Sequence, residues 1–134
     1  MLPSLPRINK TKEADFGVDF RRWIEKNPRY SSAFELKQTS KSSIPFSCVE
    51  EKQLVYGLAI KSDKGTLIRV QGINGDPDYI WCRNMPYNIV IKYPTMFCLI
   101  DVETFILEKE RSKRKSLTSD RAKEIAIKAI PMLS

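Results

Sequence analysis

Short runs rich in β-branched and aromatic residues follow one another between residues 66 and 107. They read TLIRVQGI, DYIWCRN, YNIVIKYP and TMFCLIDVETFIL, and turn-forming NGDP, NMP and Pro-Thr segments separate them. Runs of this kind, bounded by turn residues, are typical of consecutive β-strands. This half of the chain is therefore expected to form three or four strands in close succession.

Helical patterns precede and follow these strands. One face of the first helix carries Phe16, Phe20, Trp23 and Ile24. That helix should end before Pro28. A second helix is expected over CVEEKQLVYGLAI, and a last one over DRAKEIAIKAI, capped by Thr118 or Ser119. The pattern predicts an α/β fold: a single domain with a central mixed β-sheet flanked by helices.

A compact segment between the first two helices, AFELKQ at residues 33–38, is bounded by turn-forming residues and predicts one more strand. Side chains alternate along a strand, so Glu35 and Lys37 would share one face. Such charges are often the solvated side of an edge strand. At a strand end that runs into a loop, they can instead form an active site.

The composition narrows the chemistry that this protein can perform. Its formal net charge of +7 favours an anionic partner, because clustered Lys and Arg release counterions from nucleic acid. The chain has no histidine, which excludes Ser-His-Asp and Cys-His catalysis and HExxH metal sites. Its three cysteines lack CxxC spacing and are interpreted as buried thiols of a reducing compartment.

The N-terminal segment and the most apolar stretch bear on the cellular location of the protein. Residues 1–12 are interpreted as an N-terminal arm, ahead of a domain over residues 13–134. The arm has no signal-peptide pattern, and charges and a proline interrupt the most apolar region, residues 87–107. A cytoplasmic protein without a membrane partner is expected.

The pair of Glu35 and Lys37 suits phosphodiester hydrolysis, in which a carboxylate binds Mg²⁺ and an ammonium group orients a water molecule. Mg²⁺ prefers several oxygen ligands, so a second carboxylate is needed. The segment NGDPDYIW offers Asp78 at the head of the next strand, whereas Asp76 is interpreted as an ordinary turn residue.

These residues resemble a known signature. Pro77-Asp78 together with Glu35-Leu36-Lys37 resembles the PD-(D/E)XK nuclease motif. FELKQTSKSSIPFSCVEEKQ is similar to the acidic-x-Lys strand, loop and Gln-bearing helix of RecU-type and phage Holliday junction resolvase-like proteins, and RSKRKSLTSDRA to their basic segment and final helix. The resemblance covers about Glu13 to Ala126. It implies a restriction-endonuclease-like fold with rearranged motif order, because the Asp follows the acidic-x-Lys strand.

The resemblance also implies roles for individual residues. Glu35 and Asp78 would bind the metal, with Glu13 of the first helix as an additional ligand. Lys37 would be the catalytic lysine, and Gln53 would face the site from its helix. The cofactor would be Mg²⁺, with Mn²⁺ as an alternative. The substrate would be branched DNA formed in recombination, cut by a homodimer, in the host cytoplasm if a phage encodes the protein.

An alternative alignment of the PD-(D/E)XK motif, starting at Asp78, fails at one position. PDYIWCRNMPYNIVIK places Lys92 downstream of Asp78, but Val90 then occupies the acidic position and cannot bind a metal. Lys92 is therefore interpreted as a solvent-facing lysine or a phosphate contact. Both tryptophans, Trp23 and Trp81, are expected in the core, with base stacking as the alternative for Trp81.

Positive charge gathers at residues 109–116, just before the last helix. A solvated linker is one explanation, and contact with the DNA backbone is the other. The residues expected to bind DNA are Arg111, Lys113, Arg114 and Lys115, extended by Arg21 and Arg22. Two other functions stay open: a non-catalytic nucleic-acid-binding accessory protein with a nuclease-like fold, and a nuclease for linear DNA.

Overall fold

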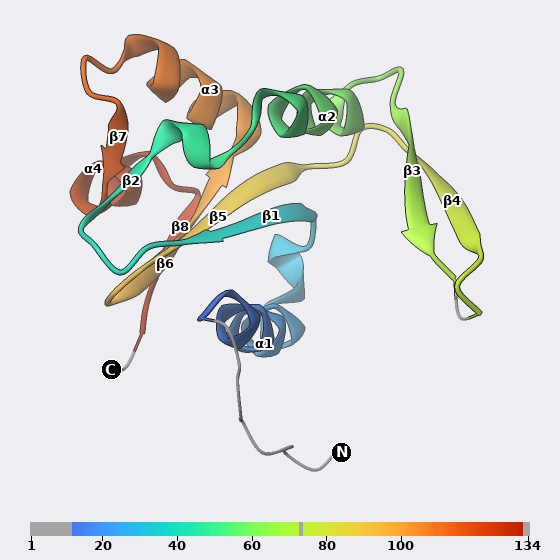
Figure 1. Cartoon of the computed structure of the whole chain (residues 1–134), viewed down its shortest axis with the longest axis horizontal. Coiled ribbons are helices and arrows are strands. Elements are labelled where there is room, and N and C mark those ends of the chain that lie inside the picture. The colour runs from blue at the N-terminus through green and yellow to red at the C-terminus, as the bar shows by residue number, and fades with distance from the viewer. Residues whose placement is uncertain (1–11, 73, 133–134) are drawn as a thin grey trace. The chain divides into compact units, whose positions relative to one another are not determined.

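A computed structural model describes the backbone of residues 12–72 and 74–132, and the side chains from Phe16 onward (Figure 1). The chain divides into two compact units, Met1–Ser31 and Ser32–Ser134. The first contains α1 (Lys12–Lys26) and the short 3-10 helix η1 (Pro28–Tyr30), so the prediction that the first helix ends before Pro28 is confirmed. Most of the predicted N-terminal arm, residues 1–11, lies outside the described residues.

The second unit is built around a four-stranded mixed sheet with the order β1-β5-β6-β8. Its elements are β1 (Ala33–Gln38), β2 (Ser43–Pro45), η2 (Phe46–Cys48), α2 (Glu51–Lys61), β3 (Thr66–Gln71), β4 (Pro77–Cys82), β5 (Tyr87–Tyr93), β6 (Met96–Asp101), α3 (Val102–Arg111), β7 (Ser116–Thr118), α4 (Ser119–Ile125) and β8 (Lys128–Pro131). Strand β1 is parallel to β5, whereas β6 is antiparallel to both β5 and β8. The predicted α/β class with a mixed sheet is therefore confirmed.

Two small two-stranded sheets complete this unit. Strand β2 pairs with β7, and β3 pairs with β4 in an antiparallel hairpin. Figure 1 shows the hairpin standing to one side of the four-stranded sheet, beyond the end of α2. The predicted strands of the middle region thus divide between the main sheet and this hairpin.

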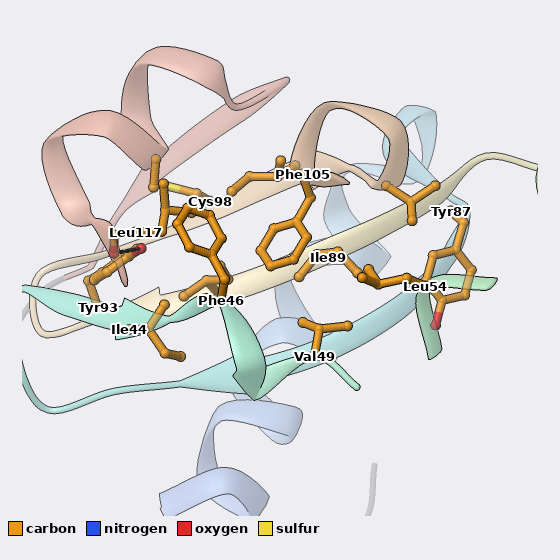
Figure 2. Packing of buried hydrophobic residues seen from close by; sticks show 14 of the residues in the cluster. Ile44, Phe46, Val49, Leu54, Tyr87, Ile89, Tyr93, Cys98, Phe105 and Leu117 are labelled. Carbon is orange, nitrogen blue, oxygen red and sulfur yellow. Dashed lines mark hydrogen bonds between the residues drawn. The ribbon is translucent and has the colours of Figure 1, made fainter. Parts of the chain in front are cut away.

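The core lies between the central strands and the helices α2 and α3 (Figure 2). Every residue of β5 except Lys92 is buried, and β5 lies between β1 and β6 in the sheet. Phe46 and Phe105 meet edge to face with ring centroids 5.7 Å apart. The hydroxyl of Tyr93 donates to the carbonyl oxygen of Leu117 at 3.0 Å, which satisfies its one polar group inside the core.

Two predicted elements were wrong. The segment VETFIL was expected to prolong a strand, but it forms the start of α3 because Asp101 caps that helix through the backbone N–H groups of Glu103 and Thr104. The last helix was expected to continue through Ile130, but it ends at Ile125 and the chain forms β8 instead. Pairing with β6 outweighs the local helical pattern there.

The predicted burial of the cysteines is confirmed for two of the three. All three cysteines are free, with Cys82 and Cys98 buried and Cys48 partly buried. Burial raises the pKa of the Cys98 thiol to about 11, so this thiol stays protonated. In the described part of the chain, no helix combines the length and the apolar character that crossing a membrane requires.

Candidate functional site

Strand β1 holds the two charged side chains that the alternation placed on one face. The Nζ of Lys37 lies 3.2 Å from the Oε1 of Glu35, and each side chain is 23% exposed. Their neighbours on β5 are Ile89 and Ile91, which belong to the buried core. The two charges therefore lie on the sheet face that the core covers, rather than on a fully solvated one.

Helix α2 supplies a third side chain to this site. The Nε2 of Gln53 donates to the Oε1 of Glu35 at 2.9 Å. At its other end, the Oε1 of Gln53 accepts from the backbone N–H of Glu50 at 2.9 Å and closes the capping box of α2. One amide group thus orients the carboxylate and stabilises the first turn of the helix.

Tyr87 is the site residue that the sequence did not indicate. It begins β5 beside Ala33 of β1, and the negative charge of Glu35 acts on its hydroxyl. Burial, followed by the negative charge of Glu35, raises the pKa of Tyr87 to about 12, so its hydroxyl remains a proton donor near neutral pH. The register of β1 against β5 would have located it, but that pairing is not local in sequence.

Glu35, Gln53 and Tyr87 border a cavity of about 450 Å³ between β1, α2 and the β3–β4 hairpin. It is lined by Ala33, Phe34, Glu35, Lys52, Gln53, Tyr56, Ile60, Ile68 and Tyr87. Glu35 is the one carboxylate among these described lining residues. The cavity therefore offers a single negative charge within a mainly apolar wall.

The position of Tyr87 depends on the close approach of Gly57. A Cβ atom at Gly57 would lie 2.7 Å from the Cδ1 of Tyr87. We expect Gly57→Ala to lower the free energy of unfolding by about 1–3 kcal/mol, because an added methyl group in a packed contact forces strain. Urea denaturation followed by circular dichroism measures this loss.

Gly17→Ala is the matched control for that substitution. A Cβ atom at Gly17, in α1, meets nothing within 4 Å among the described residues. Alanine there should therefore leave stability unchanged or raise it by up to about 1 kcal/mol, since alanine favours a helix. Equal stability of Gly57→Ala and the wild type would show that Tyr87 is not held by this contact.

The structure places Asp78 in a different sheet from Glu35. Asp78 lies opposite Val70 in the β3–β4 hairpin, is exposed, and packs beside Gly72 near the turn. The register puts it on the hairpin face that also carries Ile68, a residue of the cavity wall. Asp78 is two residues further along, or roughly 7 Å. The hairpin thus presents Asp78 on the cavity side but beyond the cavity.

The described side chains do not complete a magnesium site by themselves. Among them, no three His, Cys, Asp or Glu side chains come together as metal ligands would. Mg²⁺ takes six ligands and is usually held by more than one carboxylate or by substrate phosphates as well. Glu13 lies in α1, but its side chain is outside those that the structure describes. Among the described residues, the cavity therefore presents the carboxylate of Glu35 and no second one.

The predicted DNA-binding residues of the basic segment lie at the end of α3 and in the connection to β7. Arg111, Lys113, Arg114 and Lys115 are all exposed. Lys113 and Arg114 border a second cavity of about 350 Å³, together with the hydroxyl-bearing residues Ser112, Ser116 and Thr118. Exposed cations beside hydroxyl donors are suited to phosphate oxygens.

Other basic residues are less available for such contacts. Arg121 lines the same cavity, but Glu108 and Glu124 hold its guanidinium at 2.9 and 2.8 Å. The hydrogen bonds that the guanidinium of Arg121 donates to Glu108 and Glu124 raise its pKa above the usual range. In the first unit, Arg21 pairs with Glu25 at 3.1 Å, while Arg22 is exposed. Lys92 on β5 is partly buried.

Comparisons with known proteins assign no family to this chain. No protein-family model matches the chain, and no curated protein matches its sequence. The fold and the site define an α/β protein with a Glu-Lys-Gln cluster at a cavity and a separate basic surface. A functional proposal therefore depends on these contacts and on the motif resemblance.

Proposed function

We propose that this protein is a metal-dependent DNA endonuclease that acts on branched DNA, as Holliday junction resolvases do. The observation that carries the proposal is the contact of Lys37 and Gln53 with one carboxylate oxygen of Glu35 at the cavity edge. A carboxylate and an ammonium group so placed match the two protein groups that phosphodiester hydrolysis requires. The exposed basic segment provides charge for a DNA backbone.

Each side chain of the cluster has a distinct role in this proposal. Gln53 fixes the direction of the Glu35 carboxylate, and Lys37 places a positive charge 3.2 Å from it, where it can orient a water molecule or a phosphate oxygen. Bound Mg²⁺ or Mn²⁺ would supply an activated water and stabilise negative charge. Glu35 would be one ligand, and Asp78 or Glu13 would contribute another carboxylate.

The substrate and the assembly follow from the same proposal. The cations of residues 111–115 would bind the phosphate backbone and position the DNA without reading its sequence. A four-way junction has two-fold symmetry, so a homodimer would cut two strands at equivalent places.

Cleavage of a labelled four-way junction tests the proposal. We expect cutting by the wild-type protein in Mg²⁺ or Mn²⁺, none in EDTA, and weaker cutting of a linear duplex of the same sequence. Asp78→Asn should lower the cleavage rate on the order of 100-fold if Asp78 supplies the second carboxylate, because loss of one charge-stabilising group costs about that much.

Asp76→Asn is the matched control, since Asp76 is an exposed acid in the same hairpin. It should cut at the wild-type rate. Full cutting by Asp78→Asn would reject Asp78 as a ligand and leave Glu13, which Glu13→Gln then tests. Cutting that persists in EDTA would contradict the metal requirement, and equal cutting of the linear duplex would contradict selectivity for branches.

A non-catalytic DNA-binding protein is the second candidate. The observation that favours it is that the described side chains bring only one carboxylate to the cavity and form no group of three metal-binding residues. In that case the junction would be bound but not cut in Mg²⁺ or in Mn²⁺. The same assay, combined with a gel-shift measurement, separates the two candidates.

A further inference from the structure

The β3–β4 hairpin has two faces with different surroundings. Cross-strand pairs lie on the same face of a hairpin, so Leu67–Trp81 and Arg69–Tyr79 share one face. The alternate residues form the other face, where Ile68 lines the cavity and Cys82 is buried, while Ile80 is exposed. We call the face with Leu67, Arg69, Tyr79 and Trp81 the outer face.

Large side chains on the outer face are left to solvent. Trp81 is 60% exposed, Tyr79 56% and Leu67 49%. The expectation that Trp81 belongs to the core was therefore wrong. Two aromatic side chains two residues apart on one strand face thus leave apolar surface open to solvent, and exposed groups of this kind commonly mark a binding site.

Charge on the outer face favours an anionic ligand. Arg69 lies opposite Tyr79 and forms no ion pair among the described residues. Arg83, also exposed, follows two residues after Trp81, and Asp63 lies 3.9 Å from its guanidinium. Among the described strand residues of the hairpin, no acidic one lies on the outer face, since Asp78 is on the opposite one. A second copy of this chain would bring a surface with the same positive charges, whereas nucleic acid brings phosphates.

The outer face is also held in place. The hydroxyl of Tyr56 in α2 donates to the carbonyl oxygen of Leu67 at 3.0 Å. Trp81 covers Gly65, where an added Cβ atom would lie 3.0 Å from the indole Nε1. A base that stacks on Trp81 would therefore meet a ring whose position is already restricted, which lowers the entropic cost of binding.

We propose that the outer face of the hairpin binds unpaired nucleotides of DNA. Bases would stack on Trp81 and Tyr79, and Arg69 would contact a phosphate. This deepens the proposed function and rests on its DNA substrate, but it concerns a surface separate from the Glu35 cluster. Unpaired bases occur where a branched molecule opens, so the outer face would select opened branch points over continuous duplex.

Binding to a single-stranded oligothymidylate in EDTA tests this proposal without any cleavage. The protein has two tryptophans, so a Trp23→Phe variant reports Trp81 fluorescence alone. We expect the oligonucleotide to quench that emission. Trp81→Leu, measured by fluorescence anisotropy of a labelled oligonucleotide, should weaken binding about 5- to 150-fold, the range typical of one lost base–aromatic stack.

Three comparisons sharpen the test. Trp81→Phe keeps a ring and should retain most of the affinity. Trp81→Leu should leave the slope of log affinity against log salt concentration unchanged. Arg69→Gln should lower the magnitude of that slope by about one, because one phosphate contact is lost. Ile127→Ala, which removes a side chain that is 56% exposed outside the hairpin, should bind like the wild type.

Several results would overturn the proposal. Wild-type affinity of Trp81→Leu for the oligonucleotide is one. Another is that Trp81→Leu sediments as a monomer where the wild type sediments as a dimer, with DNA affinity unchanged. That result would show that a second copy of the chain, and not DNA, binds the outer face. If Trp81→Leu binds normally while junctions are still cut, only this proposal fails. If quenching occurs but no junction is cut in any metal, the nuclease proposal fails alone.

Discussion

Lys37→Ala is expected to lower the rate of junction cleavage about 100- to 10,000-fold, the usual range for loss of a group that assists proton transfer. The ammonium of Lys37 lies 3.2 Å from Glu35 at the cavity edge, and no other lysine contacts that carboxylate among the described residues. A shortened side chain leaves water or phosphate there without its positive partner. Single-turnover cleavage with excess protein measures the chemical step, and a gel shift checks that junction binding persists.

The control for this substitution is Lys41→Ala. Lys41 is an exposed lysine in the loop after β1, so its loss changes the net charge equally without touching Glu35. Glu35→Gln should match Lys37→Ala in the cleavage assay, since it keeps the shape and removes the charge. The free energy of unfolding of Lys37→Ala should lie within about 1 kcal/mol of the wild-type value, because partly exposed ion pairs contribute little to stability. Undiminished cutting by Lys37→Ala would remove Lys37 from the chemistry.

Phe105→Ala should lower the free energy of unfolding by about 3–5 kcal/mol. Phe105 is fully buried in α3 and packs edge to face on Phe46, so alanine loses both apolar burial and an aromatic pair. Domains are stable by only about 5–15 kcal/mol, and this substitution alone would remove a large share. Urea denaturation of the purified variant gives the difference directly.

Leu107→Ala provides the matched comparison on the same helix. Leu107 is 45% exposed, and its truncation should change stability by no more than about 0.5 kcal/mol. Phe105→Leu should lie between the two, because it keeps much of the buried volume and reports the cavity if the alanine variant does not fold. A loss below about 1 kcal/mol for Phe105→Ala would mean that the core around Phe46 collapses freely onto the gap.

Local signals in the sequence were enough for part of the site. Turn-forming residues bound β1 on both sides, and alternation alone put Glu35 and Lys37 on one face. The role of Gln53 came from the motif resemblance, and the structure places its amide on Glu35. Tyr87 was missed because its contact depends on which strand pairs with β1, a pairing across more than fifty residues.

The remaining wrong predictions share one physical cause. The local sequence of each segment fits more than one structure, and contacts outside the segment decide which one forms. VETFIL is apolar enough for a strand, but the carboxylate of Asp101 caps a helix there. IAIKAI suits a helix or a strand, and the open edge of β6 selects the strand. Asp78 has the right residue type and faces the cavity side, yet the separate pairing of β3 with β4 places it in another sheet.

The amide of Gln53 links the start of α2 and the carboxylate of Glu35 through a single residue. A capping box accepts glutamate as readily as glutamine, so the helix alone would not distinguish the two. The carboxylate of Glu35 requires glutamine at position 53, because only glutamine has an N–H group to donate to it. Glutamate there would place a second negative charge beside Glu35. Gln53→Glu would therefore keep the cap of α2 and remove the hydrogen bond to Glu35.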